Sequence, residues 1–272
     1  MCKKMSFLVL VVLVGVLGSS VFATTFIWQG AASNLWLANG LSNWAQGGLY
    51  PSSTDDVKIT HKPAIYIPRM PTIAVGNAYA NTLFVGVDWA DPSQGAVLTV
   101  DSGTLTVSTA IQVGYTTTTT HVTDMINMNG GTITAPFMNI GHLGIGALNM
   151  NGGTINLSGL LKVPSQTGSG TVNLAGGTIY ADGLYMQSAG YMNITGDGKL
   201  VLNNASVTIS DVEWTIQDFI YYGWLEANGS ADDVVVDYAM NPGKVTVYAI
   251  PEPATMAMLS IGGLLALKRR KR

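Results

Sequence analysis

The chain repeats itself in three segments near its middle: INMNGGTIT (126–134), LNMNGGTIN (148–156) and VNLAGGTIY (172–180). The copies begin 22 and 24 residues apart. Each combines an apolar–polar–apolar strand pattern, a glycine-centred turn, and a second strand that opens with Thr-Ile. Looser copies flank them, LTVDSGTLT (98–106) and MNITGDGKL (192–200). Such a period predicts one supersecondary unit per repeat.

A third short strand completes each period, in the segments 137–141, 160–164 and 184–188. Two or three short strands in 20–28 residues correspond to one coil of a β-solenoid, or parallel β-helix. A single coil cannot bury its apolar side chains, so neighbouring coils must stack to form a core. The sequence therefore predicts an all-β chain with solenoid repeats over residues 96–205 and capped ends.

Stacking places equivalent residues above one another at the spacing of neighbouring strands. One predicted apolar column contains Ile126, Leu148, Val172 and Met192, and a second contains Met128, Met150, Leu174 and Ile194. A polar column between them contains Asn127, Asn149, Asn173 and Asn193. We interpret it as a structural ladder of side-chain amides, because amide stacking stabilises such arrays. The alternative is a row of ligand-binding amides.

The charge of the chain is concentrated at its two ends. Residues 24–250 contain six Lys and Arg against fifteen Asp and Glu, a net charge of about −9. Nucleic-acid binding needs clustered Lys and Arg on one face, so this composition argues against it. The three histidines show no metal-ligand spacing, and no cofactor motif appears. We expect no cofactor, no metal and no catalytic residue.

The first residues have the pattern of a secretory signal peptide. Lys3 and Lys4 precede an apolar run over residues 7–18, and small residues follow. The pattern predicts residues 1–23 as the signal, recognised by the Sec translocon and cut after Ala23. Cys2 is the only cysteine and leaves with the signal, so the exported chain must fold without disulfides.

Residues 24–95 form a predicted N-terminal β segment in which Trp28, Trp36 and Trp44 are eight residues apart. We interpret the tryptophans as a cap over the first coil, because terminal repeats are atypical. The alternative is a platform on which sugar rings stack. The order Trp-Gln-Gly, Asn-Trp, a proline and Asp-Asp-Val-Lys-Ile (55–59) resembles the leading segment of autotransporter-passenger-like bacterial surface proteins with β-strand repeats.

Residues 206–250 form the predicted C-terminal β cap, with strands expected over 214–227 and 244–250. Its acidic residues, Glu226, Asp232, Asp233 and Asp237, are interpreted as solvated loop residues rather than a calcium site. Some parallel β-helices cleave polysaccharides, but no carboxylate pair or nucleophile motif is singled out here. We expect a protein that is not an enzyme, with a polysaccharide lyase or hydrolase as the remaining alternative.

The tail runs from Pro251-Glu252-Pro253 through an apolar segment, 254–267, to the basic residues Lys268, Arg269, Arg270, Lys271 and Arg272. The pattern predicts a short transmembrane helix with its basic end in the cytoplasm. The order of these features over residues 251–272 resembles the PEP-CTERM sorting signal of exported bacterial proteins. The resemblance implies transient retention in the inner membrane and cleavage near the Pro-Glu-Pro motif by an exosortase. The alternative is a plain C-terminal anchor.

These features together predict an exported protein of the cell surface or extracellular matrix with a structural or adhesive role. Exopolysaccharide is a candidate partner. A carbohydrate-binding surface protein that uses the tryptophan-rich end is the main alternative.

Overall fold

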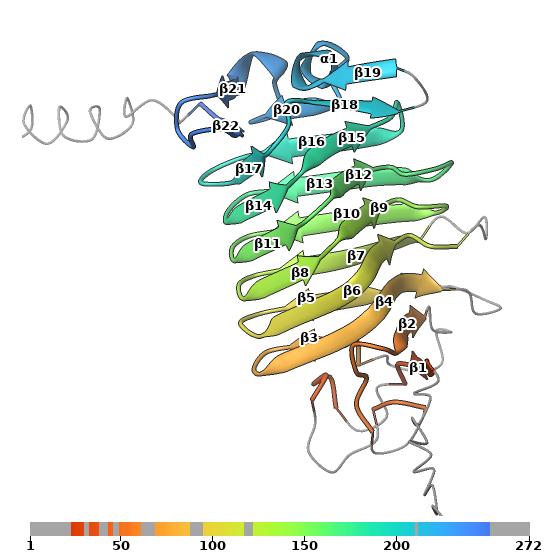
Figure 1. Ribbon diagram of the computed structural model, residues 1–272. Helices are drawn as coiled ribbons and strands as arrows, with labels where there is room; N and C mark the ends of the chain where they lie inside the picture. The colour runs from red at the N-terminus through yellow and green to blue at the C-terminus, as the bar shows by residue number, and fades with distance from the viewer. Residues whose placement is uncertain are drawn as a thin grey trace, which may run out of the picture.

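A computed structural model describes residues 23–29, 33–37, 43–45, 49–60, 69–87, 95–116, 122–209 and 212–250. The described chain winds into a stack of β coils, and the predicted β-solenoid is confirmed (Figure 1). The signal residues 1–22 and the tail 251–272 lie outside the described residues. Cleavage after Ala23, the transmembrane helix and the cytoplasmic placement of the basic end therefore stay predictions from sequence.

Three complete coils occupy the middle of the stack, and each has three strands, as the repeat predicts. The strands are β7 (Thr123–Met128), β8 (Thr132–Ala135), β9 (Phe137–Ile140), β10 (Ile145–Met150), β11 (Thr154–Leu157), β12 (Leu160–Val163), β13 (Ser169–Leu174), β14 (Thr178–Ala181) and β15 (Gly183–Met186). Each strand pairs in parallel with the equivalent strand of the next coil. The three strands of a coil therefore belong to three faces of one stack.

The outer coils keep the same pairing with fewer strands. They contain β3 (Thr72–Ile73), β4 (Asn77–Val87), β5 (Val97–Val100), β6 (Thr104–Val113), β16 (Gly190–Ile194) and β17 (Lys199–Leu202). The long strands β4 and β6 cover two faces each, and the register between them shifts between Ala80 and Thr82. Parallel stacking thus begins before residue 96, earlier in the chain than the predicted boundary.

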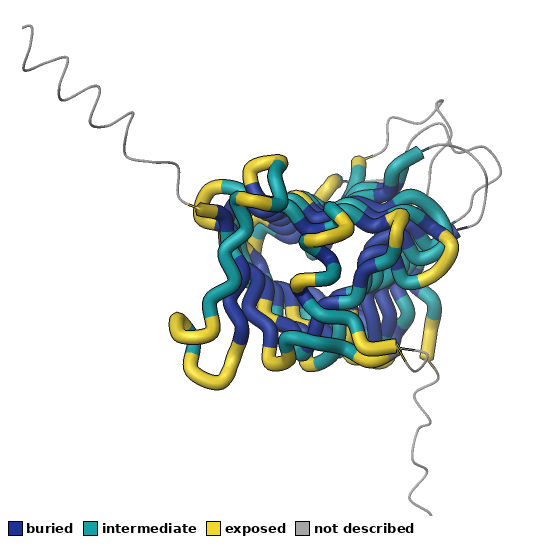
Figure 2. The backbone as a smooth tube through the Cα atoms, turned by 90° about the horizontal axis from the view of Figure 1, so that it is seen from above, coloured by how far each residue is buried: buried dark blue, intermediate teal, exposed yellow. Residues whose placement is uncertain are grey.

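Apolar side chains form the predicted columns in the interior of the stack. Leu148 lies in register with Ile126 on one side and Val172 on the other, and Val172 lies in register with Met192. All four side chains are fully buried. Figure 2, viewed along the stack, shows buried positions lining the inner side of the superposed coils. The core is therefore continuous from coil to coil, without disulfides in the described chain.

The predicted asparagine ladder is present along its first three members. The Asn149 amide donates to Asn127 Oδ1 at 2.9 Å, and the Asn173 amide donates to Asn149 Oδ1 at 2.9 Å. Asn193 is in register with Asn173, but its Oδ1 accepts from the backbone N–H of Gly229 at 3.1 Å. The last rung therefore connects the ladder to the C-terminal cap.

The turn glycine of the repeat is required by geometry. The second glycine of each Gly-Gly pair has a positive φ, +71° at Gly131, +83° at Gly153 and +76° at Gly177. A Cβ at Gly153 would lie 2.7 Å from the carbonyl oxygen of Gly131 in the coil below. Only glycine combines this conformation with such a close approach.

The C-terminal end departs from the repeat and contains a helix. Its elements are β18 (Ser206–Ile209), β19 (Val212–Thr215), α1 (Ile216–Tyr221), β20 (Leu225–Ala227), the 3-10 turn η1 (Ala231–Asp233), β21 (Val234–Asp237) and β22 (Val245–Ala249). β20 extends one sheet in parallel, whereas β22 pairs antiparallel with β17 and then with β21. The strand predicted over 244–250 is confirmed, and β22 followed by β21 covers the C-terminal end of the sheet.

The continuous strand predicted over 214–227 is wrong, because α1 interrupts it. The Thr215 hydroxyl accepts from the Asp218 backbone N–H, and the Asp218 carboxylate accepts from the Thr215 N–H, which forms a capping box. Ile216 and Phe219, three positions apart, are buried on one face. The aromatic content of this segment had favoured a strand, but local capping and a helical spacing decide its structure.

At the other end, β1 (Thr25–Ile27) and β2 (Asp56–Thr60) pair in parallel and join the sheet that contains β4. No helix within the described ranges is long and apolar enough to cross a membrane.

Candidate functional site

The three N-terminal tryptophans form one cluster at the end of the stack. The rings of Trp28 and Trp36 contact that of Trp44 edge to face, with centroids 4.9 and 4.8 Å away. Each residue is only 1 % exposed. Trp28 Nε1 donates to the carbonyl oxygen of Arg69 at 2.7 Å. Because sugar stacking needs an open ring face, the platform predicted as an alternative here is not available. The geometry fits a cap.

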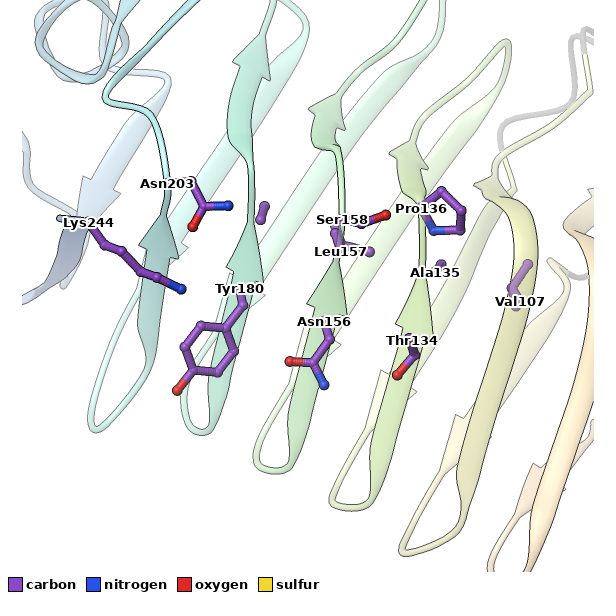
Figure 3. Close-up of a pocket in the computed structure, with 11 residues that line it drawn as sticks. Val107, Thr134, Ala135, Pro136, Asn156, Leu157, Ser158, Tyr180, Asn203 and Lys244 are labelled. Carbon is purple, nitrogen blue, oxygen red and sulfur yellow. The ribbon is translucent and has the colours of Figure 1, made fainter. Parts of the chain in front are cut away.

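A groove runs along the outside of the stack and crosses the strands of several coils (Figure 3). Its volume is about 540 Å³. The lining residues come from successive coils, except Lys244, which comes from the C-terminal cap: Val107, Thr134, Ala135, Pro136, Asn156, Leu157, Ser158, Tyr180, Ala181, Asn203 and Lys244. Its repeating composition follows directly from the stacking of the repeats.

The side of the groove is a column of polar residues that point outward. Thr106, Thr134, Asn156 and Tyr180 follow one another in register from β6 to β14. The residue after each of them, among them Leu157 and Ala181, is buried. Strand alternation explains this arrangement, because successive side chains point to opposite faces of a sheet. The groove thus has one polar side chain per coil beside a closed apolar base.

One end of the groove combines an aromatic ring with positive charge. The Tyr180 side chain is 38 % exposed, and the Lys244 ammonium lies 5.7 Å from the centroid of its ring. Lys199, also exposed, is on β17 in register with Thr178, two residues before Tyr180. The nearby Asp182 carboxylate accepts from the amides of Asn203 and Asn204 at 3.3 and 3.1 Å. Polar and cationic groups therefore face solvent together at this end.

A second group of aromatic residues lies at the C-terminal end. Trp224 stacks with Tyr222 at 5.1 Å between centroids and lies 5.6 Å from Trp214. Tyr221 is 83 % exposed and Tyr222 is 55 % exposed. Sequence reasoning placed these residues in strands of a cap and assigned them no binding role. The two tyrosines are thus open to solvent, whereas Trp214 and Trp224 are partly buried and pack against the core.

The titratable side chains with shifted pKa values have structural partners. His142 is in the turn between β9 and β10, as predicted, with Nδ1 2.7 Å from Ser165 Oγ and its ring stacked on Tyr115. Burial, and then the charge of Lys162, lowers the pKa of His142. Within the described ranges, no three His, Cys, Asp or Glu side chains are grouped closely enough to hold a metal ion.

The groove itself was not anticipated from sequence. Its signal is present in the repeat, at the last position of the quoted segments, where Thr134, Asn156 and Tyr180 differ while the preceding isoleucine does not change. This outward position differs between repeats that share the Gly-Gly-Thr-Ile motif, so the fold does not fix its side chain, which can then take part in binding. The sequence alone did not show that the neighbouring corner would leave a hollow there.

The fold defines the class of the protein as an all-β solenoid with a distinct cap at each end. Comparison with protein families then identifies the tail, because residues 249–272 match the PEP-CTERM protein-sorting motif. The resemblance seen in the sequence is thereby confirmed, and the motif implies an exported protein that is sorted by exosortase. No curated protein and no solved structure matches the chain.

Proposed function

We propose that the protein is exported through the Sec translocon, held briefly in the inner membrane, and released by exosortase to the cell surface or extracellular matrix. There the solenoid acts as a structural or adhesive element. The PEP-CTERM match at residues 249–272 is the single observation that carries this proposal. A body with a continuous core and closed ends supports it, because such a stack stays folded as an independent unit after release.

The decisive measurement is the intact mass of protein recovered from the envelope and the medium. We expect the surface form to begin after Ala23 and to lack everything from about Ala254 onward. Changing Pro251, Glu252 and Pro253 together to alanine should leave the uncut chain in the inner membrane. The control is Pro242→Ala, which changes an exposed proline in the turn before β22. A surface population that retains Lys268–Arg272 would instead support a plain anchor.

The proposed role is non-catalytic. The competing interpretation, a polysaccharide lyase or hydrolase, predicts release of reducing ends from acidic polysaccharides. A screen with and without calcium measures this directly, and turnover by the purified chain would overturn the structural role. Exopolysaccharide is the proposed partner, because a matrix protein meets it at high local concentration.

A further inference from the structure

On the basis of that function, we propose that the groove along β6, β8, β11, β14 and β17 binds one extended strand of an anionic polysaccharide, parallel to the axis of the stack. The ligand class is a linear polymer of carboxylated sugars. The surface involved is the polar column with the Tyr180 and Lys244 end, called here the groove site.

The groove site has the regular spacing of stacked strands. Neighbouring strands lie about 4.8 Å apart, so the groove site presents one polar side chain at each such step. A pyranose unit in an extended chain has a similar length, so consecutive sugars meet consecutive rungs. Thr134 and Asn156 make no side-chain hydrogen bond within the described part of the chain, which leaves their donors and acceptors for sugar hydroxyls.

The asparagine ladder, on another face of the stack, differs from the groove site in its hydrogen bonding. There Asn127, Asn149 and Asn173 bond to one another at 2.9 Å, so their amide groups already have partners. The groove site has the same rung spacing, but Thr134 and Asn156 have no side-chain hydrogen bond within the described residues and lie beside the buried residues Leu157 and Ala181. Of these two regular faces, the groove site has the free hydrogen-bonding capacity that a polyhydroxyl ligand needs.

Positive charge is present at one end of the groove site. The described chain has five Lys and Arg residues; Lys244 lines the groove site, and the exposed Lys199 lies on the neighbouring strand, in register with Thr178. The chain as a whole is acidic and repels a polyanion elsewhere. The Asp182 carboxylate, the nearby negative charge, accepts from two asparagine amides. Carboxylated sugars are therefore favoured over neutral ones at this end, with the exposed Tyr180 ring in contact with a sugar face.

The test uses the full-length chain in detergent micelles, titrated with polygalacturonate and, for comparison, with neutral dextran. We expect polygalacturonate to bind and dextran to bind at least tenfold more weakly. Lys244→Ala should weaken binding of polygalacturonate by about two- to fivefold, the range for one exposed ion pair. Tyr180→Ala should weaken it by a similar factor in high salt as well, since ring contact is not screened.

The control variant is Lys58→Ala, which removes the same charge on β2, away from the groove site. It should bind within twofold of the unchanged chain, and thermal unfolding should show that all variants are folded. Absence of polygalacturonate binding, or binding that is unchanged in the Lys244→Ala and Tyr180→Ala double variant, would overturn the inference. These outcomes are independent of tail processing, since the mass measurement on cells tests sorting alone.

Discussion

The two ends of the solenoid both carry clustered aromatic residues, but they use them in opposite ways. At the N-terminal end, Trp28, Trp36 and Trp44 meet edge to face and are 1 % exposed. At the C-terminal end, Trp224 stacks on Tyr222, and Tyr221 beside them is 83 % exposed. Residue type alone therefore does not distinguish a cap from an open aromatic surface. What differs is how the surrounding chain covers the rings.

The difference in how far the aromatic rings are buried has a physical cause at each end of the stack. Among the described residues, no regular coil precedes the N-terminal rings, and these rings close that end of the core. At the C-terminal end, Phe219 of α1 and the strand β22 already close the stack. Trp214 and Trp224 pack against that closure, and Tyr221 and Tyr222 are left exposed outside it. We therefore expect the N-terminal cluster to contribute to stability as a core does, and the exposed C-terminal tyrosines to contribute little.

The largest expected effect is at the N-terminal cluster. Trp44→Ala should lower the free energy of unfolding by about 3–5 kcal/mol, as for other large buried side chains, because Trp44 contacts Phe26, Trp28 and Trp36. Urea unfolding followed by circular dichroism measures it. The matched change at the other end, Tyr221→Ala, should stay within about 0.5 kcal/mol. Equal losses for the two variants would remove the distinction between the ends.

A smaller effect is expected at the capping box of α1. Thr215→Ala should cost about 1 kcal/mol, since it removes the hydroxyl that accepts from the Asp218 N–H. Thr215→Ser retains that oxygen and serves as the control. The Thr215 hydroxyl and backbone N–H also donate to the Asp218 carboxylate, and these hydrogen bonds hold the pKa of Asp218 below its usual value, so their contribution is lost as pH falls through that pKa. A Thr215→Ala variant as stable as the control at pH 7 would contradict this.

The smallest effect is confined to alkaline pH. Burial, with the hydrogen bond and charge of Glu226, raises the pKa of Tyr191 to about 12 from a usual value of 10. The folded state then holds the proton more tightly than the unfolded state. The resulting stability is complete below pH 10 and is lost as pH rises from about 10 to 12. Melting temperatures of the unchanged chain and of Tyr191→Phe, measured from pH 8 to 12, should converge across this interval. Parallel curves would show that the Tyr191–Glu226 contact does not hold β16 to β20.

The middle of the chain could be read from sequence because the same constraint acts in every coil. Ile133, Ile155 and Ile179 lie in register and are fully buried, as the Gly-Gly-Thr-Ile motif predicts. Because the motif repeats, the strand assigned in one coil could be checked against the equivalent segment of the next coil. The ends have no such repetition, and there α1 was predicted as a strand.

The site could be predicted only in part. The sorting motif is a linear pattern, so it was found without a structure. The groove site depends on how corner residues such as Pro136 and Ser158 leave space beside the outward column, and this depends on coil shape. Similarly, the spacing of Trp28, Trp36 and Trp44 indicated that they act together but not that their rings are buried.

The linker between the strand β22 and the sorting motif is very short. The strand ends at Ala249, and Ile250 is still tied to the cap, because its N–H donates to the Asp233 carbonyl at 2.8 Å and its carbonyl accepts from the Asn228 amide at 3.3 Å. One further residue reaches only about 3.5 Å. A protein that binds Pro251 must therefore also contact the C-terminal cap. Its recognition of the motif then depends on whether its surface fits against the cap without a steric clash. After cleavage, the released solenoid would carry only a very short C-terminal extension beyond the cap.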